Sequence, residues 1–405
     1  MAVKLNPHVA GMQCIRCDML HSIDDYFEGC PACRDAGIPS SVAPHFAELP
    51  SSLEPGGISD WLSYPMASGL GEGNTPLSGI KRLADALGVG TLYTKNEFVN
   101  PAGSHKDRMA TMIVQRALHI GASTVAVAST GNAGVSTAAY AARAGLECVV
   151  VTTPQITPNW RRALETHGAR IIATAHPDDR WKLVREMARR GEWYPVTNYL
   201  TPPVGSNPFG VDGYRAIAFE LYLQLGQAAP TDIVVPTSRG DLIWGIAKGY
   251  VDLQAAGLIR SLPRVHAVEP LPRIARALAG QGMTGSCPGS TSMVSISGDT
   301  VTYQSLKALE MTRSSAVAVT DAEVAADQAL LGREGLYLER SSVAAFSGLR
   351  RLLAQCAVPR DARVVLLATS HGYKEEALYP AHLDAVDISE FAIDWSPSAN
   401  IVARQ

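Results

Sequence analysis

Short apolar runs alternate with longer segments of helical periodicity through the middle of the chain. The short runs are rich in β-branched residues, which is typical of buried strands, whereas apolar residues that recur every three or four positions are typical of helices packed on one face. The predicted strands span 124–128, 148–152 and 169–173, and the predicted helices span 132–143, 160–167 and 178–189. This alternation predicts a parallel sheet with helices on both faces. Ligands bind beyond the carboxyl ends of the strands in such sheets, so the residues that follow each strand are the first candidates for chemistry.

Further strands are predicted on either side of this region. They span 91–94, 232–236 and 363–368, and each is followed by a polar segment that contains glycine. A capping box at 320–323 opens one further helix, and residues 335–342 lead into another that has an apolar face. Both of these last segments are interpreted as scaffold.

The composition is that of an ordinary globular protein with two or more domains. The 405 residues are 46% hydrophobic and 18% charged, with a formal net charge of −3. The sequence contains no run of lysine and arginine, no apolar stretch of membrane-spanning length and no signal-peptide core at its N-terminus. We therefore expect a cytoplasmic protein with no nucleic-acid partner and no membrane partner.

Four of the seven cysteines lie within the first 33 residues, in two Cys-x2-Cys pairs. The pairs are Cys14 with Cys17 and Cys30 with Cys33, separated by twelve residues. Four thiolates at the corners of a tetrahedron are what a structural zinc ion requires, and four cysteines leave no open position for a catalytic metal. The spacing predicts a zinc-ribbon-like segment over residues 1–37, with empty or partly oxidised thiols as the alternative.

A lysine follows the predicted strand at 91–94. Residues 100–103, Asn-Pro-Ala-Gly, predict a turn, after which Ser104 is placed to cap a helix through its hydroxyl. Lys106 would lie in the first turn of that helix, where the macrodipole opposes a cation and lowers the pKa of an amine. Such a lysine is a better nucleophile, so Lys106 is a candidate reactive residue. The alternative is a solvated, charged turn.

A candidate anion site follows the predicted strand at 124–128. Ser129, Thr130 and Gly131 lead into a helix, and backbone amides and hydroxyls at a helix N-terminus suit the carboxylate of an amino acid. These three residues are therefore predicted to bind substrate, with an ordinary helix cap as the alternative.

Five motifs occur along the chain in an order and spacing that match one known family. They are Gly-Glu-Gly-Asn-Thr-Pro-Leu at 71–77, Asn-Pro-Ala-Gly-Ser-His-Lys-Asp-Arg at 100–108, Ser-Thr-Gly-Asn at 129–132, Thr-Ser-Arg-Gly at 237–240 and Thr-Ser-His-Gly-Tyr-Lys at 369–374. They resemble the motifs of threonine synthases, which are fold-type II enzymes dependent on pyridoxal phosphate (PLP). The resemblance covers roughly residues 60–375, and the joint pattern is more specific than any one motif.

The resemblance implies a role for each of these segments. Lys106 would hold PLP as a Schiff base, and Asn132 would hydrogen-bond its phenolic oxygen. The pyridine nitrogen would meet the hydroxyl of Thr369, with Ser370 as the alternative; a hydroxyl leaves the ring a moderate electron sink, which suits elimination and replacement. The cofactor phosphate would bind where two hydroxyls and a guanidinium replace the usual glycines, at Thr237, Ser238, Arg239 and Gly240.

The fold that the resemblance implies is α/β, with two doubly wound domains and the cofactor between them. The large PLP-binding domain would comprise residues 61–120 and 210–390, and the small domain residues 121–209. Residues 38–60, rich in proline, serine and glycine, are predicted to be a linker, and residues 391–405 a tail. A homodimer acting on a small amino-acid substrate is also implied.

The chain departs from the family where the substrate phosphate should bind. Threonine synthases convert O-phosphohomoserine and water into threonine and phosphate and carry Ser-x-Asn-Pro-x-Arg, but the serine and arginine positions are Gly205 and Gly210 here. Losing such donors should cost roughly 2–3 kcal/mol per hydrogen bond unless Ser206 or Arg215 substitutes. Asp241 is also predicted to lie in the substrate site, where it would repel a phosphate unless its carboxylate faces elsewhere.

These departures predict the reaction. We expect a PLP-dependent lyase that catalyses β- or γ-elimination or replacement on an amino acid other than O-phosphohomoserine, with a neutral or cationic distal group. The alternatives are a true threonine synthase and a catalytically silent protein that uses the fold for binding.

Overall fold

The computed structural model describes residues 3–66, 69–283 and 285–375, together with two short strands near the C-terminus. Residues 1–374 form one compact unit that contains the sheets and the site described below. Residues 375–405 form a second unit, in which β14 (Phe391–Ala392) and β15 (Val402–Ala403) pair antiparallel. Most of the predicted tail, 391–405, lies outside the described residues.

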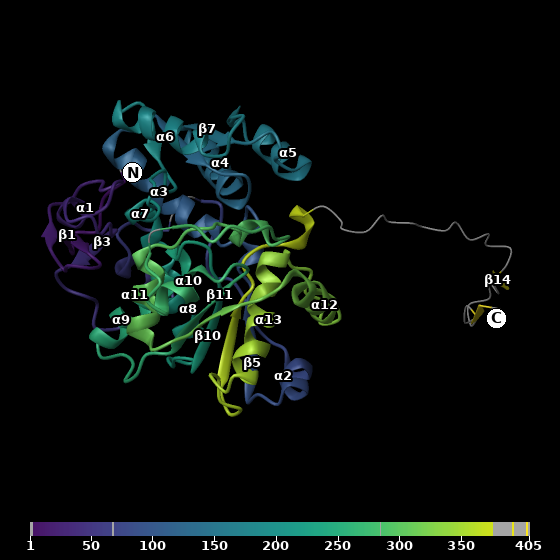
Figure 1. Cartoon of the computed structure of the whole chain (residues 1–405). Helices are drawn as coiled ribbons and strands as arrows, with labels where there is room; N and C mark the ends of the chain where they lie inside the picture. The colour runs from purple at the N-terminus through teal and green to yellow at the C-terminus, as the bar shows by residue number, and fades with distance from the viewer. Residues whose placement is uncertain (1–2, 67–68, 284, 376–390, 393–401, 404–405) are drawn as a thin grey trace. The chain divides into compact units, whose positions relative to one another are not determined.

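A six-stranded sheet forms the centre of the first unit (Figure 1). Its strands are, in order, β12 (Ala316–Ala318), β11 (Arg264–Glu269), β10 (Asp232–Pro236), β13 (Arg363–Leu367), β5 (Thr91–Lys95) and β4 (Leu77–Gly79). All neighbours pair in parallel except β4, which runs antiparallel to β5 at the edge. Alternate residues of a strand point to opposite sides of the sheet, and apolar side chains on both sides are covered by helices. In β10, Ile233 and Val235 pack into one apolar cluster, whereas Val234 packs into another with Phe346.

The second sheet has four parallel strands and is built from the middle of the chain. Its order is β8 (Arg170–Ala173), β7 (Glu147–Thr152), β6 (Thr124–Ala128) and β9 (Tyr194–Pro195). The connecting helices are α4 (Asn132–Ala144), α5 (Pro158–Thr166) and α6 (Asp179–Arg189). The predicted alternation of strands and helices is thus confirmed within a few residues. The predicted division into domains at residues 121 and 209 remains a prediction.

The other helices connect and cover the six-stranded sheet. They are α2 (Lys81–Leu87), α3 (Lys106–Ile120), α7 (Pro208–Asp212), α8 (Arg215–Gln224), α9 (Asp241–Ala255), α10 (Arg273–Leu278), α11 (Tyr303–Thr312), α12 (Asp321–Gly332) and α13 (Arg340–Ala354). The predicted capping box forms at the start of α12, where Thr320 and Glu323 exchange hydrogen bonds. Among the described helices, none is both long and apolar enough to cross a membrane.

The N-terminal segment forms a small antiparallel sheet around the cysteine pairs. Its strands are β1 (Val9–Cys14), β2 (Leu20–His21) and β3 (Val42–Phe46), and a short helix, α1 (Pro31–Asp35), carries Cys33. The predicted linker, 38–60, therefore contains a strand, contrary to expectation. The linker was predicted from the proline, serine and glycine content of the segment; Pro44 is accommodated because β3 is an edge strand, where a missing backbone donor is tolerated.

A buried ionic cluster joins the start of α3 to the surrounding segments. Arg108 pairs with Glu97 (Nε to Oε2, 2.6 Å) and with Glu220 on α8 (Nη1 to Oε1, 2.7 Å). Lys95, at the end of β5, donates to Glu220 Oε2 at 2.6 Å. Thr75 of the motif at 71–77 donates from Oγ1 to Glu97 Oε1 at 2.7 Å. The motifs at 71–77 and 100–108 are thus joined through Glu97, by a hydrogen bond from Thr75 and an ion pair with Arg108.

Candidate active site

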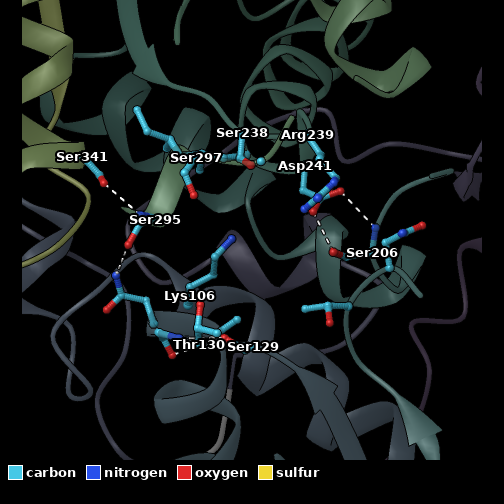
Figure 2. Close-up of a pocket in the computed structure, with 18 of the residues that line it drawn as sticks. Lys106, Ser129, Thr130, Ser206, Ser238, Arg239, Asp241, Ser295, Ser297 and Ser341 are labelled. Carbon is cyan, nitrogen blue, oxygen red and sulfur yellow. Dashed lines mark hydrogen bonds between the residues drawn. The ribbon is translucent and has the colours of Figure 1, made fainter. Parts of the chain in front are cut away.

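A cavity of about 270 Å³ lies where carboxyl ends of strands from both sheets meet. Its walls come from the segments after β6, β9, β10 and β13 and from the first residue of α3, as the carboxyl-end rule for parallel sheets predicts. Almost every predicted cofactor or substrate residue lines it: Lys106, Ser129, Thr130, Gly131, Asn132, Thr237, Ser238, Arg239, Gly240, Asp241 and Thr369. Figure 2 shows Lys106 reaching up from the side of Ser129 and Thr130 toward the loop that carries Ser238, Arg239 and Asp241.

Lys106 is the first residue of α3, as the sequence predicted, and its amine points into the cavity. Its Nζ donates to the hydroxyl of the buried Tyr214 at 3.1 Å. Burial lowers the pKa of Lys106, and the carboxylate of Asp241 partly opposes that change. The lowered pKa was predicted from the helix macrodipole, whereas burial is its main cause in the structure. Ser104 does not cap the helix; His105 is the N-cap residue, without a side-chain cap, and Ser104 Oγ lies 3.5 Å from Ser136 Oγ.

The start of α4 is organised by Ser129. Its Oγ accepts hydrogen bonds from the backbone amides of Gly131 and Gly134, each at 3.1 Å. The helix N-terminus therefore faces the cavity with its first turn fixed, which suits an anionic group.

Asn132, the first residue of α4, is bonded on both sides of its amide. Nδ2 donates to Glu339 Oε2 at 2.8 Å and to Ser295 Oγ at 3.1 Å. Oδ1 accepts from Lys374 Nζ at 2.8 Å and from Ser370 Oγ at 3.2 Å. Ser370 also donates to the carbonyl of Gly103 at 3.2 Å.

The neighbouring hydroxyl of Thr369 lines the cavity and lies 2.7 Å from Ser342 Oγ. Ser370, the alternative considered for the pyridine nitrogen, is instead engaged by Asn132 and Gly103 and is absent from the cavity walls. Of the two hydroxyls, Thr369 therefore has the access that a ligand contact requires.

The segment after β10 turns sharply into α9. Gly240 has φ +99°, and a Cβ there would lie 2.7 Å from the backbone nitrogen of Ser305, so only glycine fits. The carbonyl of Thr237 accepts from Arg273 Nη2 at 3.1 Å, which anchors the loop from behind. The first turn of α9 is thus presented to the cavity, as a phosphate site requires.

Arg239 brings positive charge to the same loop. Its guanidinium lies 4.9 Å above the ring of Trp181, and its Nε donates to Thr300 Oγ1 at 3.0 Å. Among the described residues, no carboxylate forms an ion pair with it. Burial and then the repulsion of Arg273 lower the pKa of Arg239 to about 10. A phosphate dianion would supply the missing negative charge, so the loop fits the phosphate of PLP.

Asp241 also lines the cavity, but its carboxylate is already occupied. It accepts from the backbone nitrogen of Ser206 at 3.1 Å and from Ser206 Oγ at 2.7 Å (Figure 2). The helix N-cap is Gly240, so Asp241 is the first helical residue and not the cap. The carboxylate thus faces Ser206.

The two glycines that replace family residues differ in position. Gly205 lines the cavity with φ +132°, and a Cβ there would lie 2.5 Å from Gln304 Oε1. Gly210 lies in α7, packed against α3, where a Cβ would lie 2.7 Å from Ile113 Cδ1. The expectation that both glycines shape the substrate pocket is therefore met only for Gly205.

Neither of the proposed substitutes can replace the missing donors freely. Arg215 is buried and pairs with Asp212 (2.7 Å) and Asp252 (2.7 Å), away from the cavity. Ser206 lines the cavity, but its amide and hydroxyl donate to Asp241. The cavity thus lacks the donor pair that the family motif would supply at these positions.

Several lining residues were missed by the sequence analysis. Arg180 and Trp181, at the start of α6, follow β8, so the carboxyl-end rule could have found them. Ser295 lies in a short 3-10 helix, η3 (Val294–Ile296), and Ser297 follows it; no strand directly precedes this helix, and the sequence carries no signal for the two serines. Ser341, in the segment interpreted as scaffold, also lines the cavity and accepts from the backbone nitrogen of Ser295 at 3.1 Å.

The four N-terminal cysteines come together away from this cavity. Their sulfur atoms all lie within 4.8 Å of one another, with Cys14 and Cys33 3.6 Å apart and Cys17 and Cys30 3.9 Å apart. Four thiolates around a tetrahedral zinc ion, each at 2.3 Å, would be about 3.8 Å apart. The donor set therefore fits a structural metal.

Comparison with known proteins agrees with this site. Residues 69–370 match the family described as "Pyridoxal-phosphate dependent enzyme". The threonine synthase of Methanocaldococcus jannaschii is 33% identical over 318 residues, covering 75% of this chain and 76% of the relative. The threonine synthase of Methanosarcina acetivorans is 30% identical over 386 residues, covering 90% of this chain and 92% of the relative.

Two solved structures share the fold. A threonine deaminase isoform from Solanum lycopersicum has a TM-score of 0.63 at 19% identity, covering 73% of this chain and 79% of that structure. Diaminopropionate ammonia lyase from Escherichia coli has a TM-score of 0.64 at 18% identity, covering 74% of this chain and 85% of that structure. The site and fold define a PLP-dependent enzyme of fold type II. Within that class, the chain belongs to the threonine synthase family, and it is a PLP-dependent lyase.

Proposed function

We propose that this lyase catalyses elimination or replacement at the β or γ carbon of an amino acid other than O-phosphohomoserine. The proposal rests on the side chains that line the cavity where the family motif would bind the substrate phosphate. Gly205 offers no side-chain donor, Gly210 faces α3, and the carboxylate of Asp241 lies in the wall, held by Ser206. A second phosphate dianion, next to that of the cofactor, would meet a carboxylate there and not the family's donor pair.

The residues fit PLP, and each would have a distinct task. We propose that Lys106 holds the cofactor and that Thr369 contacts the pyridine nitrogen. The loop of Thr237, Ser238, Arg239 and Gly240 would bind the phosphate at the start of α9, and Asn132 the phenolic oxygen. The bound cofactor supplies an electron sink for the carbanion formed at the substrate α carbon. Because a hydroxyl stabilises a protonated ring nitrogen less than a carboxylate would, Thr369 favours elimination and replacement.

The chain's own groups would orient the substrate and move its proton. The start of α4, with Ser129, Thr130 and Gly131, would bind the α-carboxylate. The amine of Lys106, with a lowered pKa, would accept the α-proton and return it. The hydroxyl of Tyr214, 3.1 Å away, would hold that amine in place between the two transfers.

A substrate comparison tests the proposal. The purified PLP-loaded enzyme should be assayed with O-phosphohomoserine, serine, threonine and 2,3-diaminopropionate, with release of phosphate, 2-oxo acid and ammonia as readouts. We expect faster turnover of at least one substrate without phosphate. Faster release of phosphate from O-phosphohomoserine than of any product from the others would overturn the proposal.

One observation favours the second candidate, threonine synthase itself. Arg180 lines the cavity, and among the described residues its guanidinium has no ion-pair partner, so it could receive a substrate phosphate. Arg180→Gln separates the two candidates. In a threonine synthase it should raise the KM for O-phosphohomoserine far more than the KM for serine.

For the cysteine cluster we propose one structural zinc ion per chain, bound by Cys14, Cys17, Cys30 and Cys33. The sulfur separations and the absence of an open ligand position support it. Metal analysis of protein purified without chelator should give one zinc per chain, and a variant with all four cysteines changed to serine should give none. Unchanged metal content in that variant would contradict the assignment. A homodimer and a cytoplasmic location remain predictions.

A further inference from the structure

Lys374 ends the motif at 369–374 and lies behind the cavity wall. Its Nζ donates to Asn132 Oδ1 at 2.8 Å, whereas Asn132 itself lines the cavity. Burial lowers the pKa of Lys374 to about 8, against the opposing effects of Glu339 and Asp107. The amine is therefore still mainly protonated at neutral pH and acts as a donor only.

The amide of Asn132 can have only one orientation between its neighbours. On one side, the Lys374 ammonium needs an acceptor, which Oδ1 supplies. On the other side, the Glu339 carboxylate needs a donor, which Nδ2 supplies at 2.8 Å. A rotation of the amide by 180° would place Nδ2 against the ammonium and Oδ1 against the carboxylate, and both contacts would be repulsive.

This orientation determines whether Asn132 presents a donor or an acceptor to a ligand in the cavity. One N–H of Asn132 goes to the buried Glu339, and the other goes to Ser295 Oγ, which itself lines the cavity. The second N–H is thus the one that a ligand would receive on taking the place of Ser295 Oγ as its acceptor. A cofactor phenolic oxygen is an acceptor, and it would be repelled by a carbonyl oxygen presented in place of that N–H.

The lysine motif at 100–108 makes room for Lys374. Gly103 has φ +75°, and a Cβ on it would lie 2.9 Å from Lys374 Cε. Any larger residue at 103 would push Lys374 away from Asn132. Two of the motifs that identify the family are therefore in direct contact through this lysine.

We propose that Lys374 is a positioning residue that fixes the amide of Asn132 so that an N–H faces the cofactor, an inference that rests on the proposed PLP site. It acts through Asn132 and does not itself touch the cavity. Without the ammonium, the amide loses one of the two charges that exclude the reversed orientation. The bound cofactor would then meet an acceptor for part of the time.

The test is a double-mutant cycle in which the measured quantity is the affinity of the apo protein for PLP. Fluorescence quenching and the visible absorption band report the binding. Lys374→Met should weaken PLP binding about tenfold, the scale of one hydrogen bond to a charged group. In the Asn132→Ala background, the same change should have no further effect. Lys374→Arg should restore most of the affinity, because it keeps a cationic donor. Lys81→Met, at an exposed lysine, is the matched control.

The cycle also distinguishes a merely structural role. An equal loss in both backgrounds would show that Lys374 acts independently of Asn132 and would overturn the proposal, as would unchanged affinity in Lys374→Met. If Lys374→Met fails to fold, Lys374→Gln, which retains an N–H donor without charge, is carried through the same cycle. Because PLP binding is measured without substrate, the outcome is separate from that of the substrate comparison.

Discussion

Two arginines of this enzyme, Arg108, which is fully buried, and Arg239, which is half-buried at the cavity, have pKa values that their environments shift in opposite directions. Arg108 lies in the cluster below the cavity; burial disfavours its charge, but Glu220 and Glu97 outweigh burial and raise its pKa well above the usual value. Arg239 lies beside the cavity, where burial and Arg273 lower its pKa to about 10. Two carboxylates form ion pairs with Arg108, whereas Asp299 and Asp241 act on Arg239 from farther away, and no ion pair with Arg239 occurs among the described residues.

The comparison distinguishes charged side chains that stabilise the fold through ion pairs from charged side chains that are free to bind a ligand. In the cluster, two cations, Lys95 and Arg108, meet two carboxylates, Glu97 and Glu220, at 2.6 to 2.7 Å. The charge there is balanced before any ligand binds. At the cavity, Arg239 and Arg180 have no ion-pair partner among the described residues. Positive charge that the protein leaves unpaired is the structural sign of an anion site.

The largest expected effect is at the cavity. Lys106→Ala should remove the amine that we propose holds the cofactor and moves the α-proton, lowering turnover by at least about a thousandfold, or ~4 kcal/mol. The borohydride-reducible cofactor linkage should disappear as well. Mass spectrometry of the reduced protein checks it, with Lys182→Ala, at an exposed ion pair, as control. PLP found covalently on another lysine in Lys106→Ala would disprove the assignment.

The next largest effect should fall on stability, in the balanced cluster. Arg108→Met leaves the buried Glu97 without a cationic partner and Glu220 with Lys95 alone, which costs about 3–5 kcal/mol of unfolding free energy. Chemical denaturation of the apo protein measures it. Arg82→Met, at an exposed pair with Glu334, should cost less than about 1 kcal/mol. Equal losses in the two variants would remove the distinction drawn here.

The same kind of change at Arg239 should affect the ligand and not the fold. Arg239→Gln removes a half-buried charge that has no ion-pair partner among the described residues, so the apo protein should be no less stable than the wild type. The affinity for PLP should fall about 10- to 100-fold, the loss of one or two charge-assisted hydrogen bonds. Parallel measurements of apo stability and PLP affinity check it. A destabilised apo protein with unchanged PLP affinity would place Arg239 among the structural arginines.

The smallest effect should distinguish the two cavity arginines from each other. Arg180→Gln should leave PLP affinity unchanged. In a threonine synthase, the second candidate, it should also raise the KM for a substrate with an anionic distal group by about tenfold, the scale of one charged hydrogen bond. Steady-state kinetics with two substrates of different distal charge measure it. A change in PLP affinity instead would mean that Arg180 serves the cofactor phosphate together with Arg239.

The sequence alone determined most of the local structure. The β-branched runs became β6, β7, β10 and β13, because a strand buried on both faces needs a continuous apolar run. The lysine at the start of α3 was also predictable, because the turn that precedes it is encoded by proline and glycine. The motifs then identified the cofactor class, since their spacing reflects one chemistry.

Only the tertiary structure decided which groups meet at the cavity and how they are occupied. Asn132 is bonded to Glu339, 207 residues away, and Asp241 to Ser206, 35 residues away, and no local periodicity encodes either contact. Gly210 faces α3 and Gly205 the cavity, although both lie in one short motif, because Gly210 lies in α7, which packs against α3, whereas Gly205 lies in the loop before α7. The local pattern of residues determines which segments form strands and helices, whereas contacts between side chains that are distant in sequence depend on how the two sheets pack together.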